Sequence, residues 1–168
     1  GFRLAPGGAQ SYYGVVPDMA VFAKGIANGM PLSAVCGRRD VMAISSEVFI
    51  TLTYGDEALS LAAARVTLDV VEREDVSEHI WRIGDTLVES VSRILDETQI
   101  PFAIQGINAM PAFMATHSFG DRKLSEGMQR SAWYYLLAEL ARRGVIWRKH
   151  SLLVPCYSHS ERDVGETI

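Results

Sequence analysis

Asp18-Met-Ala-Val-Phe-Ala-Lys-Gly-Ile-Ala-Asn-Gly-Met-Pro-Leu-Ser-Ala34 is the stretch that decides the fold of this chain. Residues 19–23 are apolar, and a short apolar run of this length predicts a buried strand of an α/β sheet. The run ends at Lys24, and the residues after it are typical of loops: Gly25, Asn28, Gly29 and Pro31. We therefore expect a single lysine at the mouth of a buried strand.

Lys24 admits two interpretations on this pattern alone. Most lysines that end a strand simply reach water, where the ammonium group is solvated. A lysine held in an apolar site instead has a lowered pKa, and its neutral amine can attack a carbonyl carbon. The solvated interpretation is the commoner one, so the choice between them depends on the sequence around the lysine.

A series of short motifs surrounds Lys24 in unbroken order. They are Gly1-Phe-Arg, Gly7-Gly-Ala-Gln-Ser-Tyr-Tyr-Gly14, Pro17-Asp18, Lys24-Gly25, Asn28-Gly-Met-Pro31 and Gly37-Arg-Arg-Asp-Val-Met42. As an ordered set they closely resemble the class III (ω-type) aminotransferases that use pyridoxal 5'-phosphate (PLP). Within that family the series looks most like the glutamate-1-semialdehyde 2,1-aminomutase branch. The resemblance is dense from Gly1 to about Ala64 and thin afterwards.

This resemblance implies a fold, a cofactor and two site residues. The implied fold class is α/β, a fragment of the PLP-dependent transferase fold type I with part of the large-domain sheet and a C-terminal α+β small domain. Lys24 is implied as the catalytic residue, which binds PLP as a Schiff base and then moves a proton between substrate and cofactor. Thr53 is implied to contact the cofactor phosphate of the neighbouring subunit, so a homodimer is expected.

The residues around Thr53 are informative by themselves. Residues 48–53 are apolar and β-branched, which predicts a strand or an extended arm, and a helix is expected over residues 56–73. A hydroxyl, free N–H groups and the positive end of a helix would converge there, so Thr53 is either a phosphate contact or a plain N-cap. Asp56 departs from the family pattern and adds a carboxylate that a nearby phosphate disfavours.

Composition excludes several classes of protein. Of the 168 residues, 48 % are hydrophobic and 21 % are charged, which is typical of a globular chain. The net charge of -4, without a basic stripe, argues against nucleic acid as a partner, and no run of about 18 apolar residues predicts a membrane span. Cys36, Cys156 and the scattered histidines fit no metal-ligand spacing, so we expect reduced thiols, no metal and a cytoplasmic protein.

Two domains are expected along the chain. Residues 1–74 are interpreted as the C-terminal portion of a large PLP-binding domain, and residues 75–168 as a small C-terminal domain truncated at its last helix. In the second part the pattern predicts an amphipathic helix through Ile80 and Leu95, strands over 102–107, 110–116, 145–147 and 152–157, a helix from Ser125 to Arg143, and a capping box at Ser160 and Asp163. The family's upstream cofactor contacts have no counterpart before Gly1, so the chain is expected to be the C-terminal part of a longer enzyme.

The resemblance thus implies PLP-dependent amino-group transfer on a small amino acid or amino aldehyde. It does not separate a transaminase from a 2,1-aminomutase, and a racemase or decarboxylase on the same scaffold stays open. The alternative from another class is a catalytically incomplete fragment that acts only as a folding or oligomerisation unit without bound cofactor. Uncovered sheet edges predict that the fragment alone aggregates.

Overall fold

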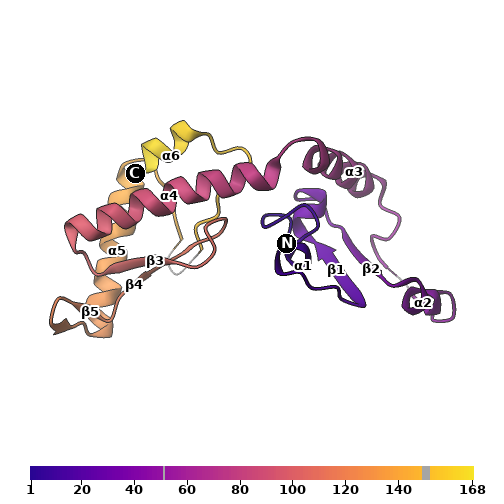
Figure 1. Cartoon of the computed structure of the whole chain (residues 1–168), viewed down its shortest axis with the longest axis horizontal. Coiled ribbons are helices and arrows are strands. Elements are labelled where there is room, and N and C mark those ends of the chain that lie inside the picture. Colours follow the sequence, from indigo (N-terminus) through magenta and orange to yellow (C-terminus); the bar gives the residue numbers. More distant parts are fainter. Residues whose placement is uncertain (51, 149–151) are drawn as a thin grey trace. The chain divides into compact units, whose positions relative to one another are not determined.

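The computed structural model describes residues 1–50, 52–148 and 152–168 (Figure 1). The described chain divides into two units, Gly1–Glu78 and His79–Ile168, and each unit has hydrophobic clusters of its own. Among the described helices, none is long and apolar enough to cross a membrane. The interpretation of residues 1–74 and 75–168 as parts of a large and a small domain stays a prediction.

The first unit is built around an antiparallel pair of strands. Strand β1 (Met19–Ala23) pairs with β2 (Ser33–Gly37), and Val21 lies opposite Val35 in the register. The remaining elements of this unit are α1 (Ala9–Tyr13), the 3₁₀ turn η1 (Lys24–Ala27), α2 (Arg39–Met42), the 3₁₀ turn η2 (Ala43–Ser46) and α3 (Ala58–Arg73). The predicted strand before Lys24 is therefore confirmed.

The burial expected for this strand is wrong in this chain. Met19, Val21 and Ala23 point to an exposed face, while Ala20 and Phe22 on the other face are half-buried. Val21 is 70 % exposed. The physical reason is that, in the described chain, β2 is the only strand beside β1 and no element covers its outer face.

The core of the first unit joins η1 to α3. Ile26 and Ala27 of η1 are buried against Ala64 of α3, and Ala27 has no exposed surface. Small side chains at Ala27 and Ala64 allow the two backbones to lie close together. Ser77, at the start of the next helix, donates a hydrogen bond of 2.8 Å to the Phe2 carbonyl and so ties the first residues to this unit.

The second unit contains the amphipathic helix that the sequence predicts. Helix α4 (Val76–Thr98) buries Ile80, Ile83 and Leu87 on one face, as expected from the spacing of its apolar residues. Gly84 lies on the same helix, where an added Cβ would lie 2.0 Å from the Asn108 carbonyl oxygen. The glycine therefore permits the 106–109 loop to pack directly on the helix.

The rest of the second unit contains an aromatic cluster. Strands β3 (Phe102–Gln105) and β4 (Ala112–Ala115) pair antiparallel, β5 (Ser118–Phe119) and β6 (Arg122–Lys123) form a small hairpin, and α5 (Glu126–Arg142) and α6 (Glu161–Thr167) follow. Trp133 of α5 is 1 % exposed and packs on Phe102 and Phe113, with ring centroids 5.2 Å and 5.8 Å away. The ring of Trp147 is 5.6 Å from that of Trp133 and completes the cluster.

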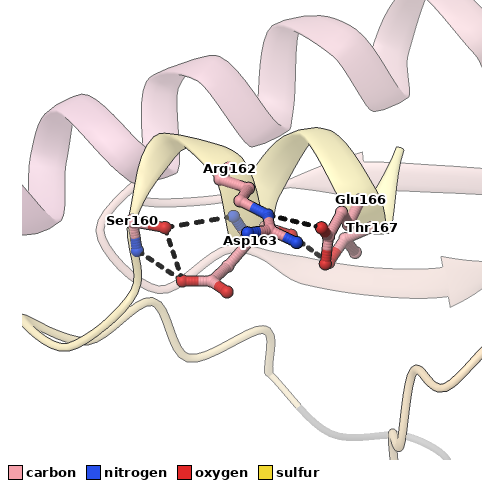
Figure 2. Close-up of polar contacts among 5 residues, drawn as sticks. All are labelled: Ser160, Arg162, Asp163, Glu166 and Thr167. Carbon is pink, nitrogen blue, oxygen red and sulfur yellow. Dashed lines mark hydrogen bonds and ion pairs between the residues drawn. The ribbon is translucent and has the colours of Figure 1, made fainter.

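Two predicted helix caps are confirmed and several predicted strands are wrong. Ser125 caps α5, and Ser160 forms with Asp163 the capping box of α6, in which Ser160 N donates to Asp163 Oδ2 over 2.7 Å (Figure 2).

Residues 145–148 form no strand, and Leu152 makes only an isolated bridge to Ala112. The described residues between 48 and 53 form no strand, which leaves the predicted alternative of an extended arm, and Thr51 lies outside the described residues. Apart from this single bridge, these apolar runs pair with no strand in the described part of the chain, and an extended segment without a pairing partner forms no ladder.

Candidate functional site

Lys24 stands where the strand ends and the 3₁₀ turn begins. It is the first residue of η1, directly after Ala23 of β1. Its backbone has a φ of 56°, in the left-handed region. An L-residue in this conformation costs about 1–2 kcal/mol relative to the right-handed one. Backbone strain of this kind is concentrated at functional sites, and here it falls on the residue that the sequence analysis selects.

A half-buried residue on one side and a buried residue on the other hold this strained backbone. Phe22, two residues before Lys24, and Ile26, two residues after it, belong to the same hydrophobic cluster as Ala64. The Lys24 side chain itself is exposed, and its amine makes no hydrogen bond or ion pair with any described residue. The desolvation expected for Lys24 is therefore not provided by this chain. What the described chain provides is an exposed amine on a firmly anchored turn.

The helix after Thr53 begins later than the sequence predicts. Its first residue is Ala58, and the N-cap is Glu57, so the prediction of Thr53 as a plain N-cap is wrong. The Glu57 carboxylate accepts hydrogen bonds from Leu59 N at 2.9 Å and from Ser60 N at 2.6 Å. Thr53 lies in the preceding turn, exposed, and its hydroxyl has no hydrogen-bond partner among the described residues.

Glu57 changes what the end of α3 can bind. The Ser60 hydroxyl and the amides of Leu59 and Ser60 all donate to its carboxylate, and these bonds hold the pKa of Glu57 below its usual value. The amides that were expected to be free for a phosphate are thus already bonded to a negative charge. A phosphate at Thr53 would have to be held by the turn and its hydroxyl rather than by the helix end.

Replacing Glu57 with Ala should lower the melting temperature by a few degrees, because an N-cap is lost. Since the pKa of Glu57 is lowered in the folded state, the cap should stabilise the fold above the pKa of an unfolded glutamate and fade as the pH falls through the lowered value. Circular dichroism melts at pH 7 and pH 3 measure both effects. Asp56→Ala is the matched control, and an equal loss in that variant would contradict the assignment of the cap.

The strained φ of Lys24 predicts an order of stability among its variants. Lys24→Gly should be more stable than Lys24→Ala by about 1 kcal/mol, because glycine adopts positive φ without a steric penalty. Both changes remove the same amine, so the comparison isolates the backbone. Urea unfolding followed by circular dichroism measures the difference. Equal stabilities, or a more stable alanine variant, would show that the backbone at this position is unstrained.

Neither site residue lines the hollow that the first unit contains. This hollow of about 370 Å³ lies between α1 and the β1–β2 pair, and its wall includes Gln10, Ser11, Phe22 and Cys36.

Arg38 offers no free anion site, because its guanidinium donates to Asp18 at 2.8 Å and also to Asp40. The part of the chain that the structure describes has no cluster of His, Cys, Asp and Glu that could hold a metal ion, and Cys36 and Cys156 are free thiols.

Comparison with known proteins places these features in a family. The family model of class III aminotransferases matches residues 7–155. The chain belongs to the class III aminotransferase family. The family predicted from the motifs around Lys24 is thereby confirmed.

Named relatives of this class III aminotransferase chain include both transaminases and aminomutases. Glutamate-1-semialdehyde 2,1-aminomutase of Methanosarcina acetivorans is 37 % identical over 66 % of this chain and 27 % of its own length. The 3-aminobutyryl-CoA aminotransferase of Cloacimonas acidaminovorans is 26 % identical over 100 % of this chain and 39 % of its own length. The chain thus spans well under half the length of these relatives.

Solved structures confirm the predicted fold class. The FumI protein of Sphingopyxis sp. MTA144, in its PLP internal aldimine form, matches 99 % of this class III aminotransferase chain and 38 % of its own, with a TM-score of 0.85 and 23 % identity. A glutamate-1-semialdehyde aminomutase from Pseudomonas aeruginosa PAO1 matches 99 % of this chain and 40 % of its own, with a TM-score of 0.72 and 25 % identity. The chain is an α/β fragment of the fold of PLP-dependent transaminases.

Sequence patterns gave no warning of two features of the site. Lysine is not a residue type that favours a left-handed backbone, so position 24 gave no signal of it, whereas Asn28, at φ 46°, is of a type that adopts this conformation readily. Glutamate is not among the favoured N-cap residues, so Glu57 carries no cap signal either. Both features become visible only when the turn and the helix are placed together.

Proposed function

We propose that this chain contributes the lysine-bearing part of a PLP-dependent enzyme that transfers amino groups, with the 2,1-aminomutase as the nearest variant. The observation that carries the proposal is Lys24, whose amine has no partner among residues 1–50, 52–148 and 152–168 and stands on a strained and anchored turn. It lies inside the stretch matched by the class III family model. The proposal extends the family membership to a residue and a chemistry.

The groups present fit the needs of PLP at two points. Lys24 would hold the cofactor covalently through its amine, and Thr53 would contact the phosphate of the cofactor in the neighbouring subunit through its hydroxyl. When bound, PLP supplies an electron sink for the substrate carbon. The Glu57 cap disfavours phosphate at the end of α3, so the fit at Thr53 is through the turn alone.

Lys24 has a second role once substrate has displaced it from the cofactor. Its freed amine would take a proton from the substrate carbon and return it at another position, as a general base and then a general acid. Lysine suits both roles, because arginine stays protonated and histidine cannot condense with an aldehyde. The anchored backbone would keep the amine within reach while its long side chain moves.

A homodimer is part of this proposal. A phosphate contact from the neighbouring subunit requires a subunit boundary beside Thr53, and stable boundaries of that kind bury a large apolar area. The residues near Thr53 supply apolar surface, since Phe49 is 93 % exposed, Leu52 70 % and Tyr54 57 %. The same exposure favours the second candidate, an incomplete fragment that self-associates without cofactor.

The function is tested in the complete enzyme, loaded with PLP and assayed with two kinds of substrate. An aminomutase converts glutamate-1-semialdehyde without a separate amino acceptor, because the amino group stays on the same carbon skeleton. A transaminase instead needs both a donor amino acid and an acceptor aldehyde or keto acid. Amino-group transfer in either assay supports the proposal. Its absence in both assays, despite bound PLP, would favour a racemase or decarboxylase and contradict amino-group transfer.

A further inference from the structure

The ring of Phe2 lies beside the backbone that carries Lys24. It stacks on the ring of Phe22, with the centroids 5.8 Å apart and an angle of 25° between the planes. On the C-terminal side of Lys24, a Cβ added to Gly25 would lie 3.9 Å from Phe2 Cδ2, so the Gly25 backbone is close to the same ring. One aromatic side chain therefore lies against residues on both sides of the lysine.

Phe2 is itself held through both its side chain and its backbone. Its ring packs against the buried cluster of Ile26, Ala27 and Ala64. Its carbonyl accepts a hydrogen bond of 2.8 Å from the hydroxyl of Ser77, a residue that is 8 % exposed. A hydrogen bond at so buried a position is costly to remove, because the carbonyl would lose its partner without gaining water in exchange. The position of the Phe2 ring is thus fixed independently of Lys24.

The backbone of Lys24 needs support of this kind. Its φ of 56° lies in the left-handed region, which is unfavourable for a residue with a Cβ. Such a conformation persists only where the surrounding structure prevents its relaxation. The Lys24 side chain is exposed and makes no hydrogen bond or ion pair with any described residue, so its own contacts do not supply the support. The residues on either side of it must do so, and Phe2 lies against both.

The direction of the Lys24 side chain depends on this backbone. Relaxation to the right-handed region would rotate φ by about 120° and turn the Cα–Cβ bond away from its present direction relative to β1. An amine at the end of a long side chain would then start from a different place. Reaction rates fall steeply when a reacting group is displaced by as little as about 1 Å. Whatever holds the backbone of Lys24 therefore also controls the reactivity of its amine.

We propose that Phe2, held by Ser77, is a positioning residue for Lys24, because its ring maintains the left-handed backbone that directs the amine. The proposal rests on the function proposed above, in which this amine condenses with the aldehyde of PLP. Phe2 acts through the backbone of Lys24. Its effect should therefore appear in the stability of the turn and in the rate of that condensation.

Hydrogen exchange in the complete enzyme, stripped of PLP, tests the effect on the backbone. The Met30 amide donates to the Ala27 carbonyl at 3.1 Å, so its exchange reports opening of the turn that begins at Lys24. This amide should exchange about fivefold faster in Lys24→Ala than in Lys24→Gly, because only glycine adopts the left-handed backbone without strain. In a Phe2→Leu background the ratio should fall below about twofold, since the turn can then relax around alanine.

This ratio separates a positioning role from a merely structural one. A general loss of stability would act equally on the alanine and glycine variants and leave their ratio unchanged. Tyr13→Leu is the matched control, because it removes another aromatic ring from the first unit, one that is 62 % exposed, and should preserve the fivefold ratio. An unchanged ratio in Phe2→Leu, an equal fall in Tyr13→Leu, or equal exchange of the two Lys24 variants would overturn the proposal.

Timed labelling with PLP and borohydride in the complete enzyme tests the effect on the amine. The Lys24 amine adds to the aldehyde carbon, a C=N bond forms as water leaves, and borohydride fixes the product by adding hydride. The exposed Lys123 serves as the reference amine within the same molecule. Relative to that reference, labelling of Lys24 should be about tenfold slower in Phe2→Leu.

Ser77 provides a second pair of variants, which carries the same test if Phe2→Leu fails to fold. Ser77→Ala removes the donor to the Phe2 carbonyl and should also slow the relative labelling of Lys24, whereas Ser77→Thr keeps a hydroxyl and should restore it. Unchanged relative labelling in Phe2→Leu and Ser77→Ala would overturn this proposal alone. A wild-type enzyme without label at Lys24 would instead contradict the proposed function and, with it, this proposal.

Discussion

Borohydride reduction in the presence of PLP is expected to attach the cofactor to Lys24 and to no other lysine in stoichiometric amount. The sequence has three lysines, at positions 24, 123 and 149, so peptide mass spectrometry separates them cleanly. Lys24 is favoured because its amine is exposed on an anchored turn and has no partner within the described part of the chain. Lys24→Ala should abolish the label and, in the complete enzyme, lower the rate by about 10⁴-fold or more.

Two variants control this experiment. Lys123→Ala removes an amine from the β5–β6 hairpin of the second unit and should leave both the label and the rate unchanged. Lys24→Arg keeps the charge but cannot condense with an aldehyde, so it should behave like Lys24→Ala. Labelling spread evenly over the lysines, or retained in Lys24→Ala, would show that PLP reacts here as a general aldehyde reagent and would remove the support for the site.

The candidate site could be located from the sequence because its signals are local. The motifs around Lys24 predict the family without any knowledge of packing, and the match to the family model confirms that family. The environment of the lysine could not be predicted in the same way. Whether a strand is buried depends on what covers it, and in the described chain β1 has one neighbour and one open face.

The fold shows the same division between local and non-local information. The caps at Ser125 and Ser160, and the buried face of α4, follow from residues three or four positions apart, and all were predicted correctly. The strands expected over 145–147 and 152–157 were wrong, because an extended run becomes a strand only when a distant segment pairs with it. The Glu57 cap at the start of α3 is a local feature that was nevertheless not predicted, because glutamate has no strong preference for the N-cap position.

Removal of the Trp133 side chain is expected to have the largest effect on stability. This residue is 1 % exposed, and its ring contacts Phe102, Phe113 and Trp147 across the core of the second unit. Truncation of a buried tryptophan to alanine costs about 3–5 kcal/mol, because the cavity left behind forfeits both burial and contact. Since a domain of this size has a total stability of about 5–15 kcal/mol, Trp133→Ala should remove a large part of the stability of the second unit and lower its urea midpoint.

Tyr134→Ala is the matched control for this change. The neighbouring residue on α5 is also aromatic, but its side chain is 60 % exposed, so its loss should alter stability by less than about 1 kcal/mol. Urea titration followed by far-ultraviolet circular dichroism compares the two variants with the wild-type chain. If both variants unfolded at the same urea concentration, the aromatic cluster would not be the source of stability. Both variants remove an aromatic side chain from neighbouring positions of α5, so a difference in their stability reports the burial of the side chain rather than its residue type.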